Sequence, residues 1–226
     1  MAYFPRTVDA ELATLLAANG AVVIEGPKAC GKTETARRQA ASEVLLDIDL
    51  NAQQAAALDP GLILPGAHPR LLDEWQLQPA IWNHVRRAVD AGKQPGMYIL
   101  TGSAVPADDH TRHTGAGRFG RVRMRPMSLC ETGVSTRQVS LKGLLAGEPT
   151  RSPDSGLTIG DLLEEVVRGG WPGFRDLELP AATRAVRDYL DQVLRQAGFD
   201  GHLEARISSW GEERCLSYGC SEEVQR

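Results

Sequence analysis

The most informative part of the chain reads Ala21-Val22-Val23-Ile24-Glu25-Gly26-Pro27-Lys28-Ala29-Cys30-Gly31-Lys32-Thr33. A short apolar run is followed here by a loop that fits the pattern G-x-x-x-x-G-K-[ST] in full. Glycines let the backbone of such a loop turn its N–H groups inward, where they surround a phosphate group. The residues from Gly31 to Ala41 have the pattern of a helix. The sequence therefore predicts a strand, a phosphate-binding loop and a helix in succession.

Residues 26–33, which we call the phosphate loop, have distinct expected roles. The Lys32 ammonium group reaches the β- and γ-phosphates of a nucleotide in this motif, and the Thr33 hydroxyl is a ligand of Mg²⁺. The helix that starts at Gly31 adds the positive end of its dipole. We expect ATP and Mg²⁺ as cofactors. The candidate nucleotide-binding residues are Gly26, Pro27, Lys28, Ala29, Cys30, Gly31, Lys32, Thr33 and Glu34.

A second candidate site element is Arg70-Leu71-Leu72-Asp73-Glu74, which is typical of a strand with two carboxylates at its end. We expect Asp73 to organise Mg²⁺ and Glu74 to polarise the attacking water. The apolar run is short, so any exposed Asp-Glu pair after two leucines would look the same. At the end of the next predicted strand, Thr101 or Ser103 could orient that water, although a plain strand ending would have the same sequence.

The chain between Ala21 and Ser103 alternates short apolar runs with longer amphipathic ones, which is typical of βαβ units with a parallel sheet. Residues 106–126 lose this periodicity and are expected to form a loop. We predict an α/β fold, with a parallel sheet flanked by helices and followed by a small helical segment. The predicted strands are Ala21–Glu25, Val44–Ile48, Arg70–Asp73 and Met97–Thr101; the predicted helices are Val8–Ala18, Gly31–Ala41, Asn51–Leu58, Pro79–Ala91, Ile159–Arg168 and Ala181–Leu194.

An arginine cluster follows the last predicted strand of this region. Four arginines stand within eight residues and without an acidic residue among them: Arg118, Arg121, Arg123 and Arg125. An arginine donated by a neighbouring subunit can neutralise charge on the γ-phosphate, and Arg118 is the first candidate for this role, with Arg121 the second. The segment Arg118–Arg125 would then join copies of the chain into a homo-oligomer. Contact with DNA phosphates and a solvated surface are the other interpretations.

Composition excludes several classes of protein. The chain has 226 residues, with 42% hydrophobic and 24% charged residues and a net charge of −4, which excludes collagenous and disordered chains and argues against a large nucleic-acid footprint. Its longest apolar stretch, Leu15–Ile24, is about half of the ~20 residues that a membrane helix needs. The amino terminus lacks the features of a signal peptide. The four cysteines form no C-x-x-C pair, so we expect no structural metal. Because the sequence has neither a membrane helix nor a signal peptide, we expect a cytoplasmic protein with no membrane partner.

Taken together, these motifs resemble a bacterial family of AAA-type P-loop ATPases whose ATPase domain precedes a C-terminal nuclease-like domain of unknown function. The resemblance covers most of the chain from Tyr3 to about Val193 and implies an ATP-binding domain in which Asp73 and Glu74 have the roles given above. Members of that family are usually much longer, so the chain resembles a truncated member. The matching phrases are Ile24–Thr33, Leu72–Gln76, Leu100–Ser103, Gly117–Phe119, Met124–Leu129 and Gly169–Pro172.

The resulting expectation is a P-loop ATPase domain over residues 1–140, a helical region over 141–195 that begins a truncated C-terminal half, and a divergent tail over 196–226. The function we expect is Mg²⁺-dependent binding of ATP and its hydrolysis to ADP and phosphate. The alternative is a truncated nucleotide-binding protein without turnover, with a weak DNA-contacting arginine patch. A nucleotide kinase is disfavoured because no acceptor-binding or lid segment is identifiable.

Overall fold

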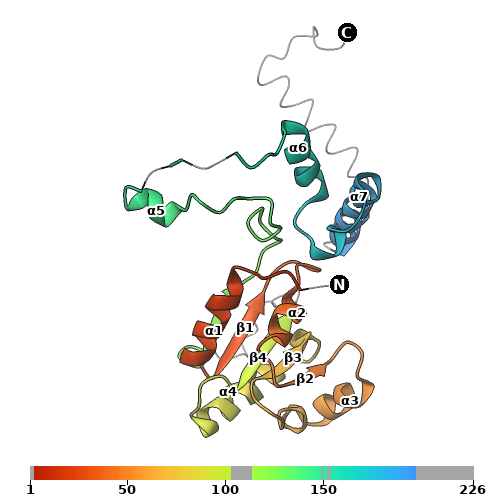
Figure 1. The fold of residues 1–226 in the computed structure, drawn as a ribbon. Coiled ribbons are helices and arrows are strands. Elements are labelled where there is room, and N and C mark those ends of the chain that lie inside the picture. The colour runs from red at the N-terminus through yellow and green to blue at the C-terminus, as the bar shows by residue number, and fades with distance from the viewer. Residues whose placement is uncertain (1–2, 103–113, 149, 152–153, 197–226) are drawn as a thin grey trace, which may run out of the picture. The chain divides into compact units, whose positions relative to one another are not determined.

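The structure is a computed structural model that describes residues 3–102, 114–148, 150–151 and 154–196 (Figure 1). The chain divides into two compact units, Met1–Asp176 and Leu177–Arg226. The larger unit contains the sheet, and the smaller unit contains helix α7 (Leu179–Gln196). Within the described residues, no helix is both long enough and apolar enough to cross a membrane.

A five-stranded parallel sheet forms the centre of the larger unit. Its strands run in the order β2-β3-β4-β1-β5, so β4 lies between β1 and β3. Because all strands are parallel, their carboxyl ends share one edge of the sheet, where Asp73 is level with Thr101 and Glu25 is level with Gly102. The strands are β1 (Ala21–Glu25), β2 (Ser42–Leu45), β3 (Arg70–Asp73), β4 (Tyr98–Gly102) and β5 (Phe119–Arg123).

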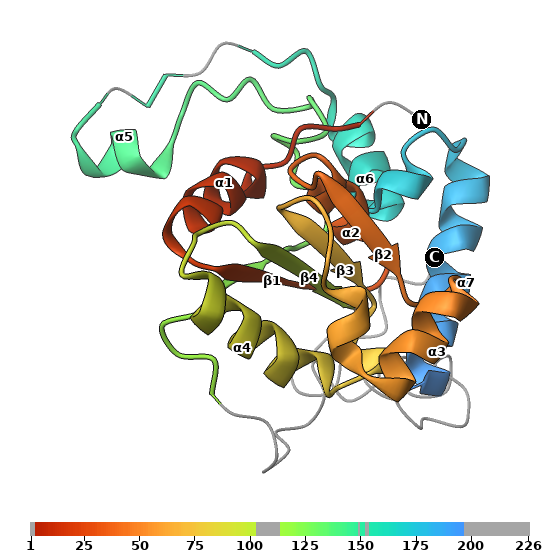
Figure 2. The ribbon, with the colours of Figure 1, turned by 90° about the horizontal axis from the view of Figure 1, so that it is seen from below.

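Helices cover both faces of this sheet, which confirms the predicted fold class. Helices α1 and α2 lie on one face, and α3 and α4 lie on the other (Figure 2). Two short helices, α5 and α6, follow β5 in the chain. The bounds are α1 (Val8–Ala18), α2 (Lys32–Arg37), α3 (Leu50–Leu58), α4 (Ile81–Gly92), α5 (Leu141–Leu145) and α6 (Ile159–Arg168), with single 3₁₀ turns at Pro60–Ile63, Trp75–Leu77 and Pro172–Phe174.

The core has two layers because successive residues of a strand face opposite sides of the sheet. In β1, Val22 and Ile24 pack with α1 and α2, whereas Ala21 and Val23 pack with α3 and α4. Full burial of a side chain such as Ile24 stabilises the fold by about 1.5–3 kcal/mol. A strand buried on both faces fixes the position of the loop that follows it.

Several segments differ from the sequence-based prediction, among them β2, which lies at Ser42–Leu45 and was predicted at Val44–Ile48. Residues 106–126, expected to be a loop, contain the edge strand β5, in which Val122 is the one large buried apolar side chain, so the apolar signal is weak. The helix predicted over Gly31–Ala41 ends at Arg37 because Ala41 N–H donates to the Pro69 carbonyl, at 2.8 Å. Helix α5 lies in the region expected to be helical over 141–195, although it was not among the predicted helices.

Candidate functional site: the phosphate loop and the carboxyl edge of the sheet

The phosphate loop connects β1 to α2 at the carboxyl edge of the sheet. Its outer residues, Pro27, Lys28 and Ala29, are exposed, whereas Cys30 is fully buried. Ala29 and Gly31 adopt positive φ values of 59° and 100°. The first N–H groups of α2 have no acceptor within the helix. The loop therefore has the irregular backbone and the free helix end that an anion-binding site requires.

Lys32 folds back onto the loop from the first position of α2. Its Nζ donates hydrogen bonds to the carbonyl oxygens of Gly26, at 2.9 Å, and Pro27, at 2.8 Å. The residue is only 6% exposed, so the ammonium group is held within the loop. A phosphate group in the loop would offer this ammonium a charged acceptor in place of two neutral carbonyls.

Thr33 and Asp73 come together although they stand 40 residues apart in the chain. The Thr33 hydroxyl lies 3.1 and 3.0 Å from the two carboxylate oxygens of Asp73. Thr101, on the neighbouring strand β4, donates to Asp73 Oδ1. Asp73 is 6% exposed. The carboxylate is thus held by two hydroxyl groups at the end of the sheet.

These oxygen atoms fit Mg²⁺, which prefers hard oxygen ligands and retains several waters. Asp73 and Thr33 would hold the ion together with phosphate oxygens and water. Within the described residues, no group of three or more His, Cys, Asp or Glu side chains could hold a metal by itself.

Glu74 follows Asp73 in a left-handed conformation, with φ 53° and ψ 39°. A non-glycine residue in this region is uncommon and is typical of functional sites. Gln76 Nε2 donates to Glu74 Oε2. Gln76 Oε1 is buried without a hydrogen-bond partner among the described residues, and it packs where a side chain on Gly102 would lie. Gln76 therefore places a second polar group beside Glu74 at the strand ends.

Three other residues predicted for the site, Glu34, Cys30 and Ser103, are not seen to point a polar group at the phosphate position in the part of the chain that the structure describes. Glu34 is exposed and pairs with Arg37 at 2.6 Å. Burial raises the pKa of the Cys30 thiol, although Lys32 and Arg6 lower it in part. A raised pKa keeps the thiol protonated and unreactive. Ser103 lies outside the described residues, so Thr101 is the hydroxyl that the structure places at the end of β4.

A model of a known protein family spans this site. A family model described as an AAA domain matches residues 18–133, just over half of the chain. The chain belongs to the AAA domain family. The prediction of an AAA-type ATPase is thereby confirmed at the level of the family. No curated protein matches the chain. Among solved structures, C. elegans PCH-2 is similar to it with 12% identity and a TM-score of 0.38, over 84% of this chain and 69% of that one.

The arginine cluster of this AAA domain spans the length of β5. Arg118 precedes the strand and is therefore at the opposite end of the sheet from the phosphate loop; its Nε lies 2.8 Å from Asp90 Oδ1. Arg121 lies over the ring of Trp82, 5.6 Å from the ring centroid, and pairs with Glu25. The structure does not bring Arg118 to the phosphate loop of its own chain.

Arg6 is a neighbour of the phosphate loop that sequence reasoning missed. Its Nη1 donates to the carbonyl oxygen of Cys30 at 2.7 Å. A second side chain, Trp171, donates from Nε1 to the carbonyl oxygen of Lys28 at 3.3 Å. Neither residue belongs to the phosphate-loop motif. Trp171 lies in the matching phrase Gly169–Pro172, whereas Arg6 lies in none of the matching phrases. The loop of this AAA domain is thus contacted from segments on both sides of it in the chain.

Proposed function

We propose that this AAA domain binds ATP in a Mg²⁺-dependent manner and hydrolyses it to ADP and phosphate. The observation that carries the proposal is the pair formed by Thr33 and Asp73, whose oxygen atoms lie 3.0–3.1 Å apart directly beside the phosphate loop. A loop of this pattern needs such a pair for the metal that accompanies a nucleotide. Family membership supports nucleotide binding independently.

Lys32 is the phosphate-binding cation in this proposal. It exchanges its two carbonyl acceptors for oxygen atoms of the β- and γ-phosphates, which are stronger acceptors because they carry charge. Backbone N–H groups of the loop hold the remaining phosphate oxygens. Thr33 and Asp73 would hold Mg²⁺, which would supply positive charge beside the phosphates.

Glu74 is the residue that prepares the attacking water. Its carboxylate accepts a hydrogen bond from the water, whose oxygen forms a new bond to the γ-phosphorus while the bond to the ADP oxygen breaks. The water proton passes to Glu74 or to the phosphate that is released. The left-handed backbone at Glu74 and the contact with Gln76 fix where this carboxylate lies.

The second candidate function is nucleotide binding without turnover. One observation favours it: Arg118, the first candidate for an activating arginine, lies at the far end of the sheet from its own phosphate loop. A chain by itself would then bind ATP but would lack the cation that stabilises charge on the γ-phosphate. The two candidates differ in whether phosphate is released.

Calorimetry with Mg·ATP and a phosphate-release assay on the same samples test the proposal. We expect the wild type to bind and to release phosphate. Lys32→Ala should lose both, while Glu74→Gln should keep binding and lose at least about 100-fold in turnover, as expected for removal of a general base. Lys142→Ala, at an exposed lysine in α5, is the control and should match the wild type.

The outcomes separate the two candidates. Binding without phosphate release by the wild type would favour the binding-only function. Unchanged turnover in Glu74→Gln would overturn the role of Glu74. If the wild type did not bind Mg·ATP, or if Lys32→Ala bound it equally well, the proposed site itself would be wrong.

A further inference from the structure

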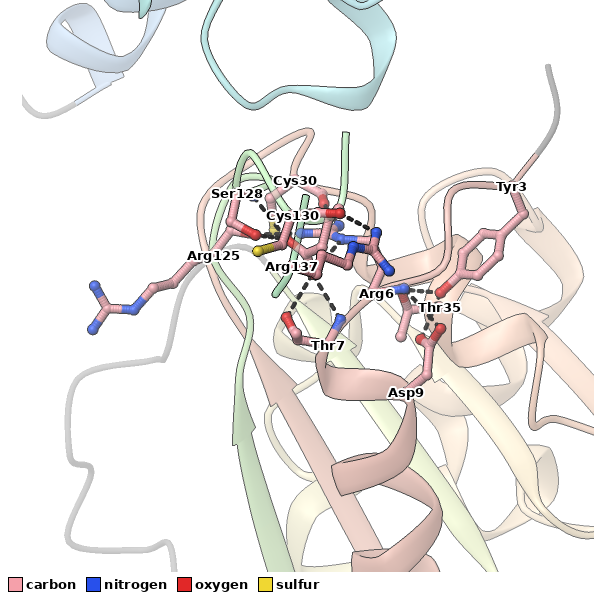
Figure 3. Close-up of polar contacts among 11 residues, drawn as sticks. Tyr3, Arg6, Thr7, Asp9, Cys30, Thr35, Arg125, Ser128, Cys130 and Arg137 are labelled. Carbon is pink, nitrogen blue, oxygen red and sulfur yellow. Dashed lines mark hydrogen bonds and ion pairs between the residues drawn. The ribbon is translucent and has the colours of Figure 1, made fainter. Parts of the chain in front are cut away.

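Arg6 is a buried arginine at the centre of a polar network beside the phosphate loop (Figure 3). It precedes α1 in the chain and is 7% exposed. Its three nitrogen atoms each donate a hydrogen bond: Nη1 to Cys30 O at 2.7 Å, Nη2 to Arg125 O at 2.7 Å, and Nε to Glu131 Oε1 at 3.2 Å. One planar group therefore joins the phosphate loop to the segment that follows β5.

Glu131 fixes the direction of the Arg6 guanidinium group. Its Oε1 also accepts hydrogen bonds from the N–H and hydroxyl of Thr7, both at 2.7 Å, and its Oε2 accepts from the N–H and hydroxyl of Ser128, at 2.8 and 3.1 Å. Rotation of the carboxylate would break hydrogen bonds at both of its oxygen atoms. The Glu131 carboxylate therefore holds Arg6 at Nε, and Nη1 is directed at the phosphate loop.

The contact with Cys30 bears on phosphate binding because of the geometry of the peptide group. The Cys30 carbonyl and the Gly31 N–H belong to one planar trans peptide, so they point in opposite directions. A donor that holds the carbonyl on one side directs the N–H to the other side. The φ angle of Gly31 offers little resistance to rotation of this peptide group, since glycine adopts positive and negative φ values with similar ease. Without a partner for the carbonyl, this peptide could turn over.

The packing around Gly31 shows that Arg6 is in direct contact with this peptide. A Cβ atom at Gly31 would lie 3.3 Å from Arg6 Nη1 and 3.6 Å from Pro172 Cγ. The Lys28 carbonyl, three residues earlier, accepts its hydrogen bond from Trp171. Two carbonyl groups of the loop are thus held from outside, by side chains that are not part of the motif.

We infer that Arg6 is a positioning residue for phosphate binding: by holding the Cys30 carbonyl, it keeps the Gly31 N–H directed toward the nucleotide phosphates. This inference rests on the proposed function, since it concerns the same site. It gives Arg6 no contact with the nucleotide. Its effect is on the shape of the loop before the nucleotide arrives, which lowers the cost of binding.

The test compares Mg·ATP affinity with folding stability in the same variants. Arg6→Lys keeps a positive charge near Glu131 but lacks the planar group that reaches three acceptors. A second variant combines Arg6→Met with Glu131→Gln, so that no ionised carboxylate is left buried without a partner; its reference is Glu131→Gln alone. The matched control is Arg70→Lys, because Arg70 donates to the Ile63 carbonyl at 2.9 Å at the other end of the sheet.

We expect Arg6→Lys and the double variant to bind Mg·ATP about tenfold more weakly than their references, as measured by calorimetry at a temperature where each is folded by circular dichroism. KM for ATP should rise by more than kcat falls. Arg70→Lys should lower the unfolding midpoint without changing affinity. If Arg6 had a purely structural role, its variants would behave like Arg70→Lys, with a lower unfolding midpoint and unchanged affinity for Mg·ATP.

Equal affinity in folded Arg6→Lys, or in the folded double variant, would overturn the inference. Failure of both variants to fold even in the cold would also overturn it, because Arg6 would then be a general structural residue. If the wild type itself did not bind Mg·ATP, the proposed function would have failed instead, which is a separate and recognisable result.

Discussion

Gly26 and Gly31 are both required in the phosphate loop, but for different physical reasons. At Gly26, a Cβ atom would lie 2.4 Å from the Met124 carbonyl oxygen, which is far closer than van der Waals contact allows. At Gly31, the backbone has a φ of 100°, which side chains disfavour. The first glycine permits a close approach of two main chains, and the second permits an unusual backbone conformation.

We therefore expect Gly26→Ala to move the loop away from Met124. The displaced backbone should weaken Mg·ATP binding severely and destabilise the fold by about 1–3 kcal/mol, as overpacking does. Urea denaturation and calorimetry measure the two effects. Gly173→Ala is the control, since nothing lies within 4 Å of the added carbon. Wild-type affinity in Gly26→Ala would show that the loop does not depend on this contact.

The predictability of the site also differs from residue to residue. Lys32, Thr33 and Asp73 could be proposed from the sequence because their chemistry is local to short motifs at strand and helix ends. Arg6 could not, since its importance comes from contacts with Cys30 and Glu131, which lie 24 and 125 positions further along the chain. Gln76 falls within the matching phrase Leu72–Gln76, but its role could not be proposed, because a glutamine near a strand end has no pattern of its own. Contacts between distant segments carry no local signal.

Among the elements, burial decided which strands were predictable. Strands β1, β3 and β4 lie inside the sheet and are almost wholly apolar or buried, so their bounds were predicted to within one residue. The edge strand β5 was missed, because its exposed positions are arginines and one of its buried positions is a glycine. An edge strand buries one face only, and its sequence resembles that of a loop.

The junction between the segment after β5 and the start of α1 predicts a dependence of stability on pH. Burial raises the pKa of Glu131, but hydrogen bonds from Ser128 and Thr7 and the charge of Arg6 outweigh it and lower the pKa to about 2. A lowered pKa contributes stability that is fully present above the ordinary value of 4.5 and is lost as the pH falls toward 2.

We expect the free energy of unfolding of the wild type to fall by about 3 kcal/mol more than that of Glu131→Gln between pH 5 and pH 2. Urea denaturation across this range measures the difference. Other carboxylates titrate in both proteins, so the comparison removes their effect. Parallel profiles for the two proteins would show that the Glu131 carboxylate has no special contact in the folded state.

At the scale of the whole molecule, we propose that one copy of the chain completes the site of another. Arg118 is the candidate, and its side chain is 44% exposed while it pairs with Asp90. An exposed ion pair of this kind is weak, so Arg118 could leave Asp90 at little cost and reach a nucleotide bound to a neighbour. This assembly is a proposal that depends on the proposed function.

We expect Arg118→Ala to bind Mg·ATP normally and to lose about 10³-fold or more in turnover. Lys32→Ala should be inactive for lack of nucleotide. A mixture of the two should regain phosphate release, because Lys32→Ala subunits would supply Arg118 to the intact loops of their neighbours. Arg184→Ala, at an exposed arginine paired with Asp188, is the control.

Absence of recovery in the mixture, or full turnover in Arg118→Ala alone, would contradict a shared site. Salt-dependent binding of DNA that is lost in Arg118→Ala would instead favour the nucleic-acid interpretation of the cluster.

The network around Arg6 also bears on the order in which the protein becomes active during its synthesis. The strand, loop and helix of the phosphate-binding motif leave the ribosome early, yet the ion that orients Arg6 is Glu131, and β1 has no neighbour on one side until β5 is made. A nascent chain that ends before Glu131 therefore has the whole motif without the framework that shapes it. We expect the capacity to hold a nucleotide to arise only after the chain has been made as far as Glu131, when the segment after β5 joins the start of α1.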